Sequence, residues 1–462
     1  MSTNLDTLRK ALEPLRDQPA ALLALILRQA ERIAQLEAEV ARLQQELAAL
    51  KGQPPGSVAP FRLANEKRVR TPQRPGRQKG HPGSARRPPM VTETITVPLA
   101  ACPQCGGPVT QRKAVSQVIE EVPPVRPRVV ALTTFTGYCA HCGPVRSTHP
   151  LQVSTAVGAA GVQLGPHALA LLVQLQHRWH LSKRKSCQLL RELFGLTLTP
   201  GGLVAATHRL ARRLEGHYQA LQAQARQAAV LHSDETGWYV GAPGATLWVF
   251  TTPTLTYYRV VTSRSRQELQ QTLGRAFGGV LVSDCLSVYD DASPRQQKCY
   301  SHHLRAIAQA RAQQGPPGSG FLCQVRTLLT TAMAVKARQG KVAAATYHQW
   351  CQRLEGVADG LLARARADPV EEAVRRRLWK QRDHLFTFLA VPEVEATNNL
   401  AERQLRPAVI ARKLGCGNRT PRGAHTWEVL ASLAVTCAQR SHSFAELVSH
   451  AFHPTPLTAP AR

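Results

Sequence analysis

The clearest hydrophobic pattern lies between residues 228 and 284, where short apolar runs alternate with polar stretches. An apolar run at 228–231 enters His232-Ser233-Asp234, and the segments 247–250 and 257–261 are rich in aromatic and β-branched residues. A Thr/Pro-containing stretch at 251–254 separates those two segments. Such runs bounded by turn residues predict three consecutive antiparallel strands.

A helix and a fourth strand follow in the same region. Leu269, Leu273 and Phe277 recur at helical spacing, so we expect a helix over 266–277 before the apolar run 279–282 enters Ser283-Asp284. In this order the first and fourth strands can lie side by side, so that Asp234 and Asp284 face each other. Two adjacent carboxylates repel each other unless a cation lies between them, so the pattern predicts a divalent metal site.

Residues 20–51 carry a heptad pattern. One apolar position holds Ile26, Ile33, Val40 and Leu47, and the other holds Leu22, Leu36, Leu43 and Leu50. β-Branched residues at one seam position and leucines at the other favour a parallel two-stranded coiled coil. The alternative is a single amphipathic helix that packs on its own chain.

Residues 53–97 are rich in Pro and Gly, with basic residues throughout and few apolar ones before Met90. This composition cannot build a core and predicts a flexible basic linker. The linker would either contact DNA phosphates and the minor groove or act as a solvated connection.

Residues 148–227 have a helical pattern. A basic segment at 183–185 leads into Leu189, Leu190 and Leu193, the stretch 195–202 forms a turn, and a second basic helix is expected over 203–214. The pattern is typical of a helix-turn-helix motif, although ordinary helix pairs look the same. The DNA-binding candidates here are Lys183, Arg184, Lys185, Arg209, Arg212 and Arg213.

The composition is strongly basic. The 462 residues include 58 Lys plus Arg and 30 Asp plus Glu, a formal net charge of +28. The length predicts several domains, and the charge indicates a nucleic-acid partner, with a generally basic soluble protein as the alternative. The sequence contains no run of eighteen apolar residues and no secretory pattern. We therefore expect a cytoplasmic protein without a membrane partner, associated with the nucleoid when bound to DNA.

Four of the eleven cysteines form two Cys-x-x-Cys pairs, each followed by glycine: Cys102/Cys105 and Cys139/Cys142. Two such pairs can present four thiolates tetrahedrally, which predicts a zinc ribbon over 98–147 with a structural Zn²⁺. A redox-active pair is the alternative.

A third carboxylate is expected from a helix near residue 402. Thr397 or Asn398 can cap a helix with Glu402 near its first turn, and Pro407 would disturb that helix soon afterwards. Nearby basic residues would bind DNA phosphates: Arg406, Arg412 and Lys413. The alternative is that the two aspartates cap strand ends and Glu402 belongs to a surface ion pair.

Four sequence blocks, taken together, resemble the catalytic blocks of bacterial DDE transposases of the insertion sequence 66 family. They are His232-Ser233-Asp234-Glu235-Thr236, Val282-Ser283-Asp284-Cys285, Cys299-Tyr300-Ser301-His302-His303-Leu304-Arg305 and Asn398-Asn399-Leu400-Ala401-Glu402-Arg403. The heptads, the basic segment at 75–83, the cysteine pairs and the helical region occur in the same order in that family.

The resemblance implies a multidomain α+β protein with a ribonuclease-H-like α/β core at 228–310 and 391–440. A helical insertion at 311–390 would interrupt this core, a coiled-coil helix at 1–52 would precede it, and a C-terminal tail at 441–462 would follow. It also implies that Asp234, Asp284 and Glu402 hold Mg²⁺, or Mn²⁺, in a two-ion site, with Asp234 bridging the ions. Glu235 would point to the opposite face of its strand. The active-site support residues would be Cys299, His302, Arg305, Asn399 and Arg403, although the Cys-x-x-His pair could also be a buried helix face.

The implied function is metal-dependent DNA cleavage at the ends of an insertion sequence, followed by strand transfer into target DNA. The expected partners are double-stranded DNA of the element ends and target, a second copy of the chain in a homodimer or higher synaptic oligomer, and accessory proteins of the same element. Two alternatives stay open: a catalytically inactive dimeric zinc-ribbon DNA-binding protein, and a ribonuclease-H-like nuclease without strand transfer.

Overall fold

The computed structural model describes residues 35, 39, 89–111, 113–154, 162–241, 244–275, 277–314 and 320–452. The chain divides into two compact units, 1–120 and 121–462, and each is described by itself. The predicted coiled coil and most of the basic linker lie outside the described residues, apart from Gln35 and Glu39, which are helical and exposed. These two predictions therefore stay predictions.

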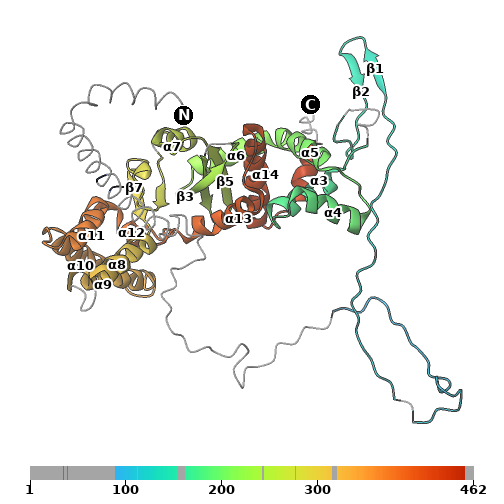
Figure 1. Cartoon of the computed structure of the whole chain (residues 1–462), viewed down its shortest axis with the longest axis horizontal. Coiled ribbons are helices and arrows are strands. Elements are labelled where there is room, and N and C mark those ends of the chain that lie inside the picture. Colours follow the sequence, from blue (N-terminus) through green and yellow to red (C-terminus); the bar gives the residue numbers. More distant parts are fainter. Residues whose placement is uncertain are drawn as a thin grey trace, which may run out of the picture. The chain divides into compact units, whose positions relative to one another are not determined.

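The second unit contains a five-stranded mixed sheet (Figure 1). Its strands are β3 (Val230–Tyr239), β4 (Gly244–Thr252), β5 (Leu255–Val261), β6 (Val280–Ser283) and β7 (Arg295–Lys298), in the spatial order β5-β4-β3-β6-β7. β4 pairs antiparallel with both β3 and β5, whereas β6 pairs parallel with β3 and β7. The three predicted antiparallel strands and the predicted pairing of the first and fourth strands are confirmed.

The strand β7 was not predicted from the hydrophobic pattern, because its sequence is Arg-Gln-Gln-Lys. Gln296, Gln297 and Lys298 are nevertheless buried. Gln297 pairs with the chain near α12 (Thr387–Ala390): its Nε2 donates to Leu385 O at 3.2 Å, and its Oε1 accepts from Phe388 N at 3.0 Å. Side-chain hydrogen bonds thus replace apolar packing in this strand.

Helices cover both faces of the sheet. On one face, Trp248, Phe250 and Leu281 pack with α6 (Glu215–Arg226) and α7 (Arg266–Leu273). On the other face, Leu247 and Val249 pack with α13 (Asn399–Gly415), and Val282 packs with α8 (Tyr300–Gln314). α14 (Pro421–Gln439) contacts the edge strand β5. Burial on both faces explains why β4 is apolar at successive positions.

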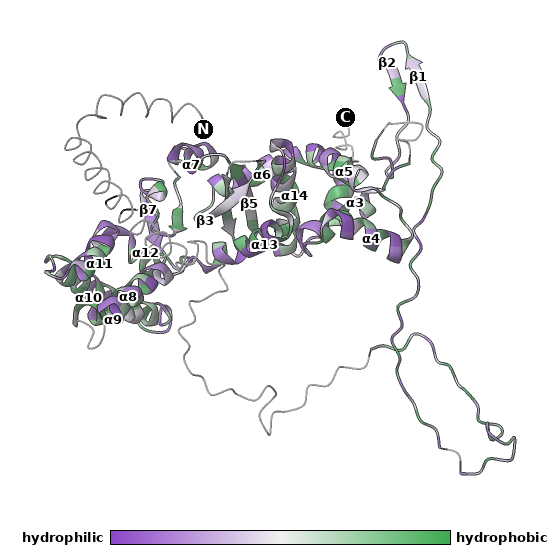
Figure 2. Cartoon of the chain, in the orientation of Figure 1, coloured by the Kyte–Doolittle hydropathy of each residue, from purple (hydrophilic) through white to green (hydrophobic). Residues whose placement is uncertain are grey.

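The region predicted as a helical insertion contains α8, α9 (Gly320–Lys336), α10 (Ala344–Leu362), α11 (Pro369–Lys380) and α12. These helices share a hydrophobic core with Val280 and Val282 of β6. The helices carry hydrophobic and hydrophilic residues together (Figure 2), as amphipathic helices that bury one side do. The helical region begins with α8 at Tyr300, earlier than the expected boundary at 311.

The predicted helix pair is present as α4 (Lys183–Phe194) and α5 (Pro200–Arg213). α5 begins at Pro200 and not at Leu203, because Thr199 Oγ1 accepts from Gly202 N at 3.1 Å and so caps the helix. Leu193 was expected on the apolar face of α4 but is 59% exposed. α3 (Pro166–His177) precedes the pair and contacts α15 (Phe444–Phe452), which lies within the expected C-terminal tail.

Pro407, which was expected to disturb its helix, lies inside α13. α13 continues through it to Gly415. None of the described helices has the length and apolar character needed to cross a membrane.

Candidate active site

Asp234 and Asp284 lie at equivalent positions of neighbouring parallel strands. The last paired residues of β3 and β6 are His232 and Val282, and each aspartate follows two positions later. Asp234 shares a face of β3 with Thr236, whose hydroxyl accepts from Arg412 of α13 at 3.1 Å. This is the face that α13 covers, so the helix that carries Glu402 packs on the side to which Asp234 points.

The neighbouring carboxylates act electrostatically on Asp234. Burial raises the pKa of Asp234 well above its ordinary value, and the negative charges of Glu235 and Asp284 raise it further, with a smaller contribution from Glu402. A hydrogen bond from Glu235 N to Asp234 Oδ1, at 2.9 Å, acts in the opposite direction. Such a concentration of negative charge in a buried place favours binding of a cation.

Glu235 faces the opposite side of the strand, as predicted. Its carboxylate accepts from Tyr289 Oη at 2.5 Å and pairs with Arg264. Burial raises the pKa of Glu235, while these two partners lower it. Glu235 therefore contributes charge to the surroundings of Asp234 from behind the sheet.

Asn398 joins three parts of the site, although sequence analysis selected its neighbour Asn399. The Asn398 side chain is fully buried, donates to Ser233 O at 2.7 Å and lies 3.2 Å from His232 Nδ1. Asn398 is the N-cap residue of α13, but its side chain makes no capping hydrogen bond because it binds β3 instead. In the sequence, Asn398 was visible as a possible helix cap and as the first residue of the Asn398–Arg403 block.

Glu402 lies beside the Cys-x-x-His segment. Within the described part of the second unit, Cys299, His302 and Glu402 form the group whose metal-ligating atoms all lie within 4.8 Å of one another. Asp234 and Asp284 do not join that group. A site for two ions about 3.5–4 Å apart does not require all its carboxylates to meet at one point.

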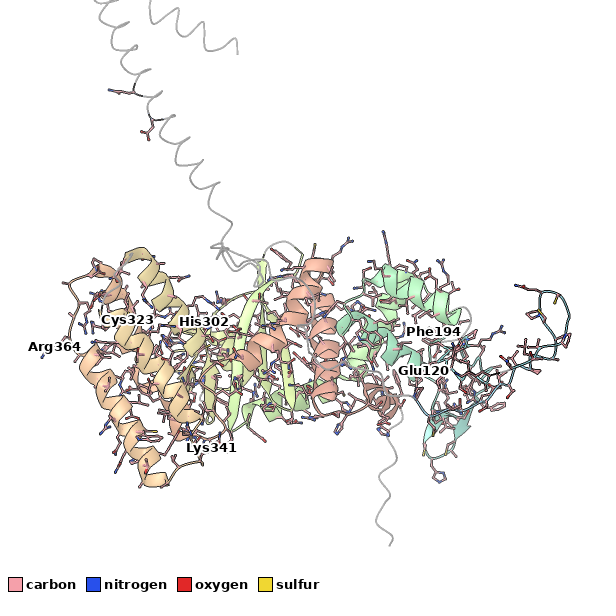
Figure 3. All side chains as sticks on the ribbon, turned by 90° about the horizontal axis from the view of Figure 1, so that it is seen from below. Glu120, Phe194, His302, Cys323, Lys341 and Arg364 are labelled. Atoms are coloured by element: carbon pink, nitrogen blue, oxygen red, sulfur yellow. The ribbon has the colours of Figure 1, made fainter. Side chains whose placement is uncertain are left out.

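Cys299 and His302 are held in environments that oppose charge. Burial raises the pKa of the Cys299 thiol, although backbone amides of Asn398, His302 and Ser301 act against it. Burial lowers the pKa of His302, so its neutral imidazole is favoured. Figure 3 shows His302 where the helical insertion meets the sheet.

The other expected support residues lie near the surface. Arg305, Asn399 and Arg403 are exposed. The Arg305 charge contributes to the lowered pKa of His302, so this side chain lies within electrostatic reach of the Cys-x-x-His segment.

The DNA-binding candidates are exposed, except for the partly buried Arg412. The exposed ones are Lys183, Arg184, Lys185, Arg209, Arg212, Arg213, Arg406 and Lys413. Arg213 donates to the carbonyl oxygen of Ala451 at 2.6 Å, at the end of α15, and Arg412 donates to Gly237 O in β3. Arg213 and Arg412 thus also connect secondary-structure elements.

Sequence analysis missed Lys298, a buried cation near the site. Its ammonium donates to Ser283 Oγ at 3.2 Å, in the residue before Asp284, and lies 5.6 Å from the ring centroid of Tyr289. Burial lowers the pKa of Lys298, and the charge of Asp284 acts against this. No hydrophobic or motif pattern marks this lysine in the sequence.

Each Cys-x-x-Cys pair adopts a tight turn. In the first unit, Gly106 has a left-handed backbone (φ 73°), and backbone hydrogen bonds from Gln104 and Cys105 lower the pKa of Cys102. In the second unit, the pair lies in the hairpin of β1 (Thr136–Cys139) and β2 (Gly143–Arg146).

The second turn repeats the first. Amides of Cys142 and His141 lower the pKa of Cys139, and Gly143 has φ 76°. Both turns therefore stabilise a thiolate, the form that binds zinc.

Comparison with known proteins identifies the family of the chain. The model of the family described as "Transposase IS66 family" matches residues 161–426, more than half of the sequence. The chain belongs to this family. The matched range contains Asp234, Asp284, Glu402 and the Cys-x-x-His segment.

Among curated proteins, the IS66 family chain is similar to the uncharacterized protein y4hP of Sinorhizobium fredii (strain NBRC 101917 / NGR234). The two are 24% identical over 391 residues, which cover 74% of this chain and 68% of the relative. Membership of a transposase family supports a protein that binds and processes DNA.

Proposed function

We propose that this IS66 family protein is a DDE transposase that cleaves DNA at insertion-sequence ends and transfers the freed strand into target DNA. The observation that carries the proposal is the arrangement of Asp234, Asp284 and Glu402. β6 and α13 both contact β3, and the charges of Asp284 and Glu402 act on the buried Asp234 carboxyl. The sheet order and the packing of α13 agree with a ribonuclease-H-like core.

The residues fit a divalent cation. Asp234 sits among three other carboxylates, and Glu402 Oε1 is buried without a hydrogen-bond partner among the described residues. Asp234, Asp284 and Glu402 would hold Mg²⁺ or Mn²⁺, since both ions prefer oxygen ligands. When bound, these ions supply activation of the attacking oxygen and charge relief at the scissile phosphate.

The chain's own groups would position DNA. Lys183, Arg184 and Lys185 are exposed in the first turn of α4, where cations destabilise a helix through its dipole. A DNA phosphate at this position would offset that cost. Arg403 and Arg406 on the exposed side of α13 would hold phosphates beside Glu402.

The remaining assignments extend the proposal to the whole chain. Cys102, Cys105, Cys139 and Cys142 would hold one structural Zn²⁺, supported by the thiolate-stabilising turn at each pair. The heptads at 20–51 would pair two copies, which a synaptic complex with two element ends requires.

The test is strand transfer by single charge-removing variants on DNA carrying the element's terminal repeats. We expect Asp234→Asn, Asp284→Asn and Glu402→Gln each to reduce strand transfer by about 10³-fold or more while end binding persists. Asp291→Asn is the matched control, because Asp291 is exposed and pairs with Arg266 on the surface.

Retained transfer in any of the three variants would refute the assignment of that acid. A wild-type chain that only shifts DNA in a salt-sensitive way would be a DNA-binding protein. One that hydrolyses DNA without joined products would be a nuclease.

A further inference from the structure

We propose that Cys299, His302 and Glu402 form a binding site for a transition-metal ion of the Zn²⁺ class, which shares Glu402 with the proposed catalytic site. The site goes beyond the proposed function, because it would bind its ion without DNA and without Asp234 or Asp284. It adds a sulfur and a nitrogen ligand to a carboxylate that the DDE assignment treats as a ligand for hard ions only.

The backbone brings the three side chains together. Cys299 immediately precedes α8 and His302 lies in its first turn, so the two side chains share one face of the helix. Tyr300 N donates to Ala396 O at 2.9 Å, and Asn398 N donates to Cys299 Sγ at 3.2 Å. These bonds fix the start of α13 against the start of α8 and so place Glu402 opposite the Cys-x-x-His turn.

The ligand atoms are close enough for one ion. All three lie within 4.8 Å of one another. Ligand atoms around a tetrahedral zinc, at about 2.0–2.3 Å from it, are roughly 3.5 Å apart, so small side-chain rotations would close the site. Cys, His and Glu are all ligands that zinc accepts.

The polar atoms at this place lack partners. Glu402 Oε1 and His302 Nδ1 are buried and make no hydrogen bond within the described residues. Buried polar atoms are normally satisfied, and an ion would satisfy the carboxylate oxygen. The alternative, in which Cys299 and His302 are only a buried helix face, leaves His302 Nδ1 unexplained, because the proposed catalytic site involves Glu402 but not this histidine.

The fourth coordination position would remain open. Three protein ligands with one open position are typical of zinc sites that bind an external oxygen ligand. Beside the exposed Arg403, the ligand class that fits is a phosphate oxygen of DNA.

The experiment is a Co²⁺ titration of the full-length chain after removal of metals under reducing conditions, with Co²⁺ replacing Zn²⁺ and no DNA present. We expect the wild type to bind one more equivalent of Co²⁺ than Cys299→Ser, and to show more sulfur-to-cobalt charge-transfer absorption. Because the test compares the wild type with Cys299→Ser, any Co²⁺ bound by the Cys-x-x-Cys pairs is present in both proteins and does not affect the difference. Cys437→Ser is the matched control. Cys437 is also a buried thiol, but it belongs to α14 and packs in the hydrophobic core instead of at the proposed site.

Two further variants keep the test decisive. His302 is only partly buried, so His302→Gln should fold even if Cys299→Ser does not, and it should weaken Co²⁺ binding at this site by about 100-fold or more. Asp234→Asn should keep the sulfur-to-cobalt charge-transfer absorption of the wild type while losing strand transfer, because Asp234 is not a ligand of the proposed Cys299 site. Equal Co²⁺ stoichiometry and spectra in the wild type, Cys299→Ser and His302→Gln would overturn the proposal.

Discussion

Asp234 shows how a single side chain at the site is held in an unfavourable state. Burial and the surrounding carboxylates raise its pKa, so the folded protein resists ionisation of this group. A carboxyl whose pKa is raised by folding contributes most stability below its ordinary pKa and loses that contribution as the pH rises through the folded value. At neutral pH without metal, Asp234 therefore destabilises the fold.

The Asp234→Asn variant should be more stable than the wild type at pH 7 in the absence of divalent ions. The expected gain in the free energy of unfolding is about 1 kcal/mol or more, because a buried charge among like charges is removed. Mn²⁺ or Mg²⁺ should raise the melting temperature of the wild type but not of this variant. The measurement is thermal unfolding with and without each ion; an Asn variant less stable than the metal-free wild type would contradict the argument.

His425 provides the opposite case of a group that folding helps to charge. Hydrogen bonds to Glu428, at 3.0 Å, and to Glu215, at 2.8 Å, raise the pKa of His425 to about 8. The imidazolium thus links α6 to α14. Its contribution to stability is complete below pH 6.5, the ordinary value, and is lost as the pH rises through 8.

His425→Gln should therefore flatten the dependence of stability on pH between about 6.5 and 8. The loss at pH 6 should be about 1 kcal/mol or less, since the side chain is nearly half exposed and solvent screens the pair. Urea unfolding at several pH values measures this. His217 is an exposed histidine on α6, the helix of Glu215, and His217→Gln should keep the wild-type slope.

At the scale of elements, the site depends on how α13 is attached to β3. The Asn398 side chain makes this attachment through Ser233 O and His232. Its backbone N–H donates to Cys299 Sγ. The side chain is buried, so removing it leaves the Ser233 carbonyl without this donor. The position of Glu402 relative to Asp234 is set by these bonds.

We expect Asn398→Ala to lower the free energy of unfolding by about 2–3 kcal/mol, which is the cost of losing a buried hydrogen bond and stranding its partner. Asn399→Ala is the matched control. The Asn399 side chain is exposed, so its removal should change the free energy of unfolding by less than about 0.5 kcal/mol. The measurement is the urea midpoint. Equal effects of the two substitutions would show that Asn398 does not hold α13.

The elements also show what a sequence can predict. β3 to β6 were predictable because each carries an apolar or β-branched run, and the pairing of β3 with β6 followed from their order. β7 was not, because its sequence is polar and its buried Gln297 is satisfied by partners about 90 residues away in the chain. Asn399 was selected in place of Asn398 because only the tertiary contacts distinguish two adjacent asparagines.

Glu402 could be found only from the motif that surrounds it, since a helix pattern does not reveal which acid faces a sheet. The same holds for its neighbours: the Cys-x-x-His spacing was visible, but its closeness to Glu402 depends on the bond between Asn398 and Cys299. Local patterns thus predicted the elements, whereas the contacts between distant elements required the structure.

At the scale of the whole molecule, the formal charge of +28 predicts salt-sensitive DNA binding, but it does not say where DNA binds. The proposal assigns contacts to the first turn of α4. Replacing Lys183, Arg184 and Lys185 together by Gln should reduce the slope of log affinity against log salt by up to about 2.7, or about 0.9 for each lost phosphate contact.

A second triple variant tests whether the change in salt dependence comes from lost DNA contacts or from the lower net charge of the chain. Arg338, Lys341 and Arg364 are exposed in the helical insertion, where Figure 3 shows Lys341 and Arg364, and their replacement by Gln removes the same three charges. If phosphates lie against α4, only the first triple variant lowers the slope, because counterion release follows the contacts that form. The measurement is end binding between about 50 and 200 mM salt. Equal reductions in both variants would mean that DNA responds to the overall charge of the chain, and α4 would lose its assignment as a DNA contact.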